Sequence, residues 1–116
     1  MKLFDSELKV MEVLWEQGET SAKDISALLN KRIGWNKNTT YTVIKKLESK
    51  GALRRSEPHF MCAPLVNKKA VQHEQTDELV KKLFDGSKKA LFSTLLSDEN
   101  LTAQDIADLR DLIEKR

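Results

Sequence analysis

Five polar side chains that lie close together in the sequence are of types that can read the bases of DNA. In the major groove, asparagine can bond adenine through two hydrogen bonds, and lysine can reach the O6 and N7 atoms of guanine. The candidates for base contacts are Asn38, Thr39 and Thr42, and those that can reach bases or phosphates are Lys37 and Lys46. Such reading requires one helix to present these side chains together on an exposed face.

Four further basic residues are better suited to DNA phosphates, namely Lys45, Lys50, Arg54 and Arg55. Phosphate contacts fix the register of a protein on the duplex without reading its sequence. Trp35 precedes these residues, and its ring can either pack against the sugar-phosphate backbone or close the protein core. The sequence leaves both roles of Trp35 open.

The charge of the chain is unevenly divided, although its net value is only +2. Between Lys31 and Arg55 there are eight basic residues and one acidic residue, Glu48, which gives a local net charge of +7. From Asn67 to Arg116 there are nine basic and ten acidic residues, a net charge of −1. Its place beside a balanced segment suggests that only the first part meets a polyanion. Charge alone, however, favours the plainer interpretation of a solvated charged face.

The reactive residues favour neither catalysis nor metal binding. His59, Cys62 and His73 form no recognisable pair of nucleophile and base, and the spacing of His59 and Cys62 is far more often chance than half a metal site. The single cysteine can form no internal disulfide and is expected to be a small buried hydrophobe. The four glycines are expected at helix ends and turns. The sequence therefore predicts no enzyme, no cofactor and no metal site.

The length of 116 residues allows one modest core and an appendage. No run of about 18 apolar residues is present, so we expect a soluble protein. The first residues, Met1 to Asp5, lack the apolar region and cleavage site of a signal peptide, which predicts a cytoplasmic location.

Capping residues and apolar spacing predict three helices in the first half of the chain. The first runs from an N-cap at Asp5 or Ser6 to Gly18, the second from Ser21 to about Lys31, and the third from Asn36 to Gly51. The inward side of the third helix is formed by Thr40, Val43, Ile44 and Leu47. The candidate base-reading residues then lie on its uncovered side.

Two short extended runs follow, Ala52 to Ser56 and Phe60 to Ala63, and a turn at Glu57-Pro58-His59 separates them. They predict a β-hairpin. Three helices followed by a hairpin, with a basic third helix, is the order of a winged helix-turn-helix. We therefore expect a mainly α fold with a small β-hairpin, in which residues 1–66 form a winged-helix DNA-binding domain.

Residues 67–116 are predicted to form three more helices and a dimerisation domain. Gly86 interrupts the pattern after the first of them, and Thr102 with Asp105 begins the last. The candidate dimer contacts are Leu79, Leu83, Phe84, Leu91, Leu95, Ile106, Leu109, Leu112 and Ile113. These faces could fold back on the first domain instead. We expect self-association, because a domain so small usually needs a disulfide, a metal or a partner.

Three stretches of the chain resemble the penicillinase-repressor family (BlaI/MecI, with CopY as a copper-responsive relative). They are Ser6-Glu7-Leu8-x-Val10-Met11-x-Val13-Leu14-Trp15, Trp35-Asn36-x-Asn38-Thr39-x-x-Thr42-Val43-Ile44-x-x-Leu47-x-x-Lys50-Gly51, and Leu101-Thr102-x-x-x-Ile106-x-x-Leu109. The resemblance implies an N-terminal winged helix, a C-terminal helical dimerisation domain and repression by binding a palindromic operator. The alternative is a winged-helix module that binds another protein without reading DNA.

The chain departs from this family at two positions that concern induction. Antibiotic-responsive members are cut at an Asn-Phe bond in the fifth helix, which makes an inducing protease a further candidate partner. No Asn-Phe dipeptide occurs here, and Phe92-Ser93 occupies the corresponding region. Copper-responsive members carry paired CxC motifs near the C-terminus, whereas this chain ends in Asp111-Leu112-Ile113-Glu114-Lys115-Arg116. The sequence disfavours direct copper sensing and leaves the inducing signal open.

Overall fold

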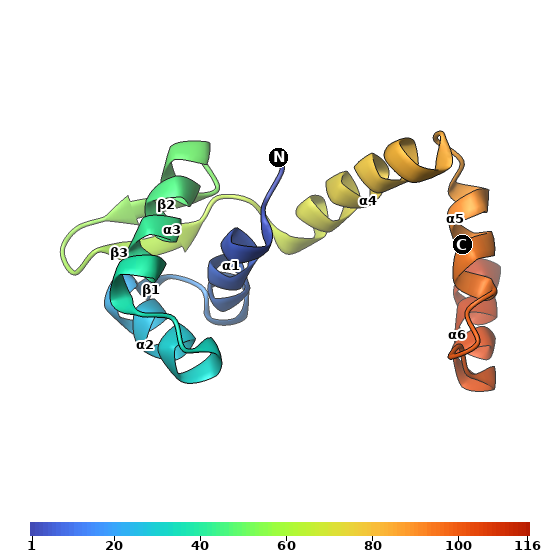
Figure 1. Cartoon of the computed structure of the whole chain (residues 1–116), viewed down its shortest axis with the longest axis horizontal. Helices are drawn as coiled ribbons and strands as arrows, with labels where there is room; N and C mark the ends of the chain where they lie inside the picture. The colour runs from blue at the N-terminus through green and yellow to red at the C-terminus, as the bar shows by residue number, and fades with distance from the viewer. The chain divides into compact units, whose positions relative to one another are not determined.

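A computed structural model describes all 116 residues as six helices and three short strands (Figure 1). The chain divides into two compact units, unit 1 from Met1 to Gln75 and unit 2 from Thr76 to Arg116. None of the six helices combines the length and the apolar character that crossing a membrane requires.

Three helices form the framework of unit 1, and their ends follow from local capping. They are α1 (Asp5–Gln17), α2 (Ala22–Ile33) and α3 (Lys37–Lys50). The predicted caps of α2 and α3 are confirmed, since the Ser21 hydroxyl accepts the Asp24 N–H at 3.1 Å and the Asn36 amide oxygen accepts the Thr39 N–H at 2.8 Å. Both helices end at a left-handed glycine, Gly34 or Gly51.

The predicted N-cap of α1, Asp5 or Ser6, is wrong, because the helix begins one or two residues earlier than expected. The N-cap is Phe4, whose side chain makes no capping hydrogen bond. The Glu7 carboxylate instead accepts the Phe4 N–H at 2.8 Å. One orphan amide at the start of the helix is thereby satisfied from inside the helix, so neither Asp5 nor Ser6 is needed as a cap.

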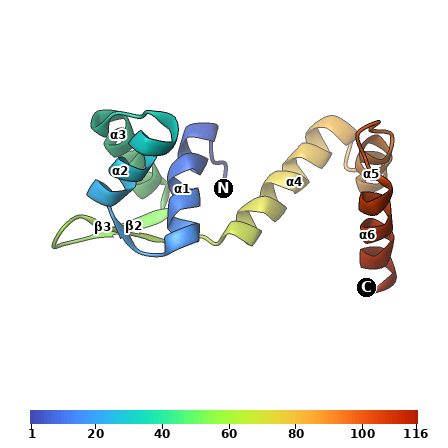
Figure 2. The ribbon, with the colours of Figure 1, turned by 90° about the horizontal axis from the view of Figure 1, so that it is seen from below.

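The predicted hairpin is confirmed to within a residue, as β2 (Leu53–Ser56) and β3 (Met61–Pro64). A third strand, β1 (Thr20–Ser21), pairs with β3, so the antiparallel order is β1-β3-β2. Strand β1 is not predictable from the sequence, because two residues carry no alternating pattern. The loop between β2 and β3 extends beyond the helices of unit 1 as a wing (Figures 1 and 2).

The core of unit 1 is closed around α1, α2 and α3. Its fully buried large side chains include Met11, Leu14, Ile25, Ile44, Leu47 and Leu53. α1 buries Val10, Met11, Val13 and Leu14, while Leu8 and Trp15 are half-buried against the same core. Cys62 is fully buried, as expected.

Helix α4 (Lys68–Phe84) contributes its first turns to unit 1. Val71 is buried in the core, and the Gln75 amide donates to the carbonyl of Leu3 at 3.4 Å. The predicted domain boundary lies between residues 66 and 67, whereas these contacts extend the compact unit to Gln75. The assignment of DNA-binding and dimerisation roles to the two parts stays a prediction.

Unit 2 contains the end of α4 together with α5 (Lys88–Leu96) and α6 (Ala103–Glu114). The predicted start of α6 at Thr102 and Asp105 is confirmed, and these two residues form a capping box with hydrogen bonds of 3.0 and 3.1 Å. The one buried apolar residue of unit 2 is Val80, in α4. Eight large apolar side chains of unit 2 are exposed, namely Leu79, Leu83, Phe92, Leu95, Leu96, Ile106, Leu112 and Ile113. Phe84, Leu91 and Leu109 are half-buried.

An apolar hollow of about 360 Å³ lies between α5 and α6. It is lined by Phe92, Leu96, Leu109, Leu112, Ile113 and Arg116. Five of these six side chains are hydrocarbon. Unit 2 therefore forms its helices without enclosing a core within one chain.

Candidate nucleic-acid interface

One side of α3 is fixed in the core and the opposite side is left in solvent. Thr40, Val43, Ile44 and Leu47 are buried, which confirms the predicted inward side. We call the exposed residues of the other side the reading face. They are Lys37, Asn38, Thr39, Thr42, Lys45 and Lys46, and all six are exposed.

The start of the reading face is held rigidly. The cap at Asn36 fixes the first turn of α3, and the Asn30 side chain donates to the carbonyl of Trp35 at 3.0 Å. The Trp35 ring is half-buried against the core of unit 1. Of the two roles left open for Trp35, core closure is the one for which the structure provides contacts.

The lysines of the reading face have no internal counter-charge. The ion pairs of the structure leave Lys37, Lys45 and Lys46 without a carboxylate partner. The ammonium of Lys37 lies 5.4 Å from the centre of the Tyr41 ring. Unpaired cations beside amide and hydroxyl groups suit a polyanion whose bases are read at the same surface.

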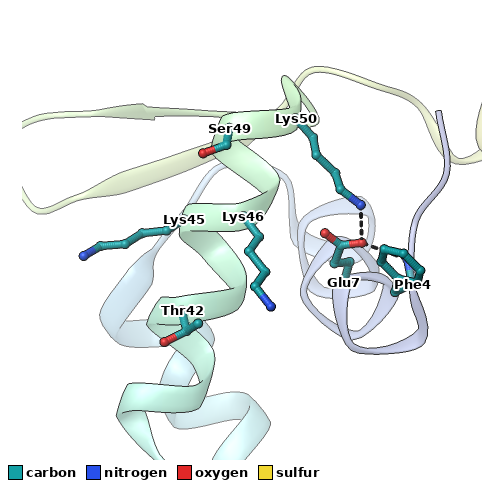
Figure 3. Close-up of a pocket in the computed structure, with 7 residues that line it drawn as sticks. All are labelled: Phe4, Glu7, Thr42, Lys45, Lys46, Ser49 and Lys50. Atoms are coloured by element: carbon teal, nitrogen blue, oxygen red, sulfur yellow. Dashed lines mark hydrogen bonds and ion pairs between the residues drawn. The ribbon is translucent and has the colours of Figure 1, made fainter.

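Lys50 differs from these lysines because its charge is used inside the protein (Figure 3). Its ammonium lies 2.6 Å from the Glu7 carboxylate, donates to the carbonyl of Lys2 at 3.0 Å, and stands 4.6 Å from the centre of the Phe4 ring. The Glu7 side chain is only 2% exposed. Lys50 was expected at a DNA phosphate, but the structure gives it a structural partner.

A surface hollow of about 570 Å³ adjoins the reading face. Figure 3 shows Lys45 extending away from the Glu7–Lys50 pair, with Thr42 and Lys46 on the same helix. A neighbouring hollow of about 430 Å³ shares Thr42 and Lys46. Ser49 lines the first hollow and Ser6 the second, and neither is among the site residues predicted from the sequence. Ser49 could have been found from its spacing of three and four residues from Lys46 and Lys45.

The two arginines of the wing are both exposed but have different surroundings. Arg55 lies 3.6 Å from the Glu48 carboxylate, and its guanidinium is 4.4 Å from the centre of the Phe60 ring. Arg54 has no ion pair within the chain.

Cys62, opposite Arg55 in the strand register, has its pKa raised to about 11, chiefly because burial disfavours the thiolate.

No three His, Cys, Asp or Glu side chains of the chain are grouped so that they could hold a metal ion. What the structure offers at the surface of unit 1 is a helix with an exposed polar and basic side, a three-stranded sheet and a projecting hairpin. These features define a winged-helix protein with a nucleic-acid-binding type of surface.

The chain belongs to the penicillinase repressor family, because the profile of that family matches residues 3–115. This confirms the resemblance inferred from the sequence. The methicillin resistance regulatory protein MecI of Staphylococcus aureus (strain N315) is 23% identical over 99% of this chain and 95% of its own length. The penicillinase repressor of Bacillus licheniformis is 22% identical over 98% of this chain and 91% of its own length.

A solved structure supports the winged-helix assignment. The solution structure of the DNA-binding domain of the repressor BlaI matches with a TM-score of 0.55 and 28% sequence identity. The match covers 58% of this chain and 84% of that one. This match, together with the observed helices and sheet, confirms the predicted fold class. The relatives are named as repressors and regulators.

Proposed function

We propose that this chain is a transcriptional repressor that binds a palindromic DNA operator as a homodimer. The observation that carries the proposal is the reading face of α3. Its amide and hydroxyl groups are exposed, and its lysines have no carboxylate partner in the chain. In this proposal Asn38, Thr39 and Thr42 contact bases, while Lys45 and Lys46 contact phosphates.

The homodimer is supported by the composition of the surface of unit 2. Eight large apolar side chains are exposed there, against one buried apolar residue. Four of them, Phe92, Leu96, Leu112 and Ile113, line one apolar hollow, and exposed apolar surface of this kind often marks an interaction site. We propose that residues 67–116 form the dimer contact and residues 1–66 the DNA-binding part, so that two reading faces meet two half-sites of one operator.

The proposal can be tested by selecting bound sequences from random DNA duplexes with the full-length protein. A dimer related by two-fold symmetry should select a palindrome, and the distance between half-sites should be close to one helical turn or a multiple of it. Selection of a single, non-repeated half-site would contradict the homodimer. No enrichment of any sequence would contradict specific reading by α3.

Salt dependence separates DNA binding from the alternative, a winged helix that binds another protein. Affinity for the selected duplex should fall about a thousandfold or more between about 50 and 200 mM salt if six or more phosphates are contacted by the dimer. A duplex affinity that does not change with salt would favour the protein-interaction module.

A further inference from the structure

The wing is attached to α3 by four side chains, which we call the wing clamp: Tyr41, Glu48, Arg55 and Phe60. Tyr41 and Glu48 come from α3, two helical turns apart, while Arg55 comes from β2 and Phe60 directly precedes β3. The Phe60 ring lies 5.6 Å from the Tyr41 ring, and the Arg55 guanidinium lies 4.4 Å from the centre of the Phe60 ring. Arg55 also pairs with Glu48 at 3.6 Å.

These contacts form a closed circuit between the two elements. Starting from α3, it runs from Tyr41 to Phe60, from Phe60 to Arg55, and from Arg55 back to α3 at Glu48. The guanidinium is planar, so it can stack on the ring with one face and still donate to the carboxylate from its edge. The two points of attachment on α3 restrict rotation of the hairpin about either one.

The backbone at the tip of the wing is held in an unfavourable conformation. His59 and Phe60 have φ angles of 72° and 51°, in the left-handed region that bulky side chains rarely adopt. Such residues persist where the surrounding structure over-determines them. Here the Phe60 carbonyl accepts the Ala22 N–H at 2.9 Å, and its ring is held between Tyr41 and Arg55.

The strand register gives the two wing arginines different positions. Successive residues of a strand point to opposite faces, so Arg55 shares the face of the buried Leu53, and Arg54 lies on the other. Arg55 is opposite the buried Cys62, whereas Arg54 is opposite Ala63, which is only half-buried. Arg54 has no carboxylate partner, in contrast to Arg55.

We propose that the wing clamp sets the position of the wing relative to α3, with Arg55 as a positioning residue and Arg54 as the phosphate contact of the wing. This division of roles rests on the proposed function, but the clamp itself does not. It replaces the expectation that both arginines bind phosphates alike. Because the wing is already fixed in the free protein, less conformational entropy is lost when it binds the duplex.

The clamp can be tested without DNA by NMR of the full-length protein. Protons of a side chain stacked on an aromatic ring resonate upfield, so the Arg55 δ-methylene should be shifted upfield in the wild type. The shift should disappear in Phe60→Leu and be retained in Phe60→Tyr, which keeps the ring. Wild-type Arg55 protons at unstructured-peptide positions would overturn the clamp.

The division of roles is tested by salt titration of duplex binding. Arg54→Ala should lower the slope of log affinity against log salt by about one per subunit. Arg55→Ala, an exposed substitution that leaves the core intact, should weaken binding about two- to fivefold with an unchanged slope. Adding Phe60→Leu to Arg55→Ala should weaken binding by less than the sum of the two single effects. Both changes remove the Arg55–Phe60 contact, and Phe60→Leu removes in addition only the contact of Phe60 with Tyr41.

A reduction of the slope by about one per subunit in Arg55→Ala would overturn its positioning role, and so would full additivity with Phe60→Leu. A wild-type protein that binds no duplex at any salt concentration would contradict the proposed function and the role of Arg54. The NMR shifts would still decide whether the clamp exists, so the two failures can be distinguished.

Discussion

Unit 1 and unit 2 differ in how much apolar surface they bury within one chain. Unit 1 contains fifteen of the sixteen buried apolar residues of the chain, and unit 2 contains only Val80. Unit 2 nevertheless has well-capped helices, with a serine cap on α5 and a full capping box on α6. The difference shows that helix signals in a sequence are local, whereas closure of a core depends on what else is present to cover it.

The largest expected effect follows from breaking the proposed contact of unit 2. Leu109→Asp or Ile113→Asp would place an unpaired carboxylate in an apolar contact, at a cost of several kcal/mol. We expect a monomer, with operator affinity reduced by orders of magnitude because two linked half-sites become independent. Sedimentation measures the first effect and duplex titration the second.

The matched control for these variants is Ala107→Asp, an exposed change of the same charge on the opposite side of α6. It should remain a dimer. Both tryptophans of the chain, Trp15 and Trp35, lie in unit 1, so their fluorescence shows whether unit 1 stays folded. A Leu109→Asp protein that remains dimeric at low micromolar concentration with full operator affinity would exclude α6 as the subunit contact.

A smaller effect is expected from the reading face of unit 1. Asn38→Ala and Thr39→Ala should each weaken binding to the selected site by about 1–3 kcal/mol per lost base contact, with little change on random duplex. The start of α3 should be unaffected, since the cap is the side chain of Asn36 and the Thr39 backbone N–H remains. Equal losses on both duplexes would show that these side chains touch only the DNA backbone.

The lysines Lys50 and Lys46 should respond differently to the same substitution. Lys50→Met removes the partner of the buried Glu7 carboxylate and should lower the free energy of unfolding of unit 1 by about 1–3 kcal/mol. Lys46→Met should leave that free energy unchanged and lower the salt slope by about one per subunit. Urea unfolding followed by tryptophan fluorescence, together with duplex titration, measures both. Equal stability of the two variants would show that the Glu7–Lys50 pair contributes nothing.

The last effect concerns pH and again belongs to unit 1 alone. Burial raises the pKa of Cys62 from 9.0 to about 11, so between these values the folded chain keeps a proton that the unfolded chain has lost. The stabilisation is complete below about pH 9 and is lost as the pH rises toward 11. The free energies of unfolding of the wild type and of Cys62→Ala should therefore approach each other as the pH rises through that range. Parallel pH dependences of the two free energies would argue against the raised pKa.

Features decided within one helical turn were predictable from the sequence. Ser21 and Asn36 were recognised as caps because the side chain and the amide that it bonds are three residues apart. The reading face followed by exclusion, once Val43, Ile44 and Leu47 had been assigned to the core.

Features that join distant residues were not predictable in this way. Glu7 and Lys50 are 43 residues apart, and each has an ordinary local explanation, as a first-turn acid and as a surface base. The two-residue strand β1 exists only because β3 lies beside it. The neighbour of Arg55 across the wing, Phe60, depends on a left-handed backbone that its own residue type disfavours.

The uncovered apolar surface of unit 2 has a consequence for how such a protein would respond to its own abundance. If two chains must meet to cover it, the active species grows with the square of chain concentration while monomers predominate. Halving the number of chains would then reduce operator occupancy about fourfold, provided that the operator is also far from saturated. Gene expression could be released by dilution through cell growth, with no ligand bound and no chain cut.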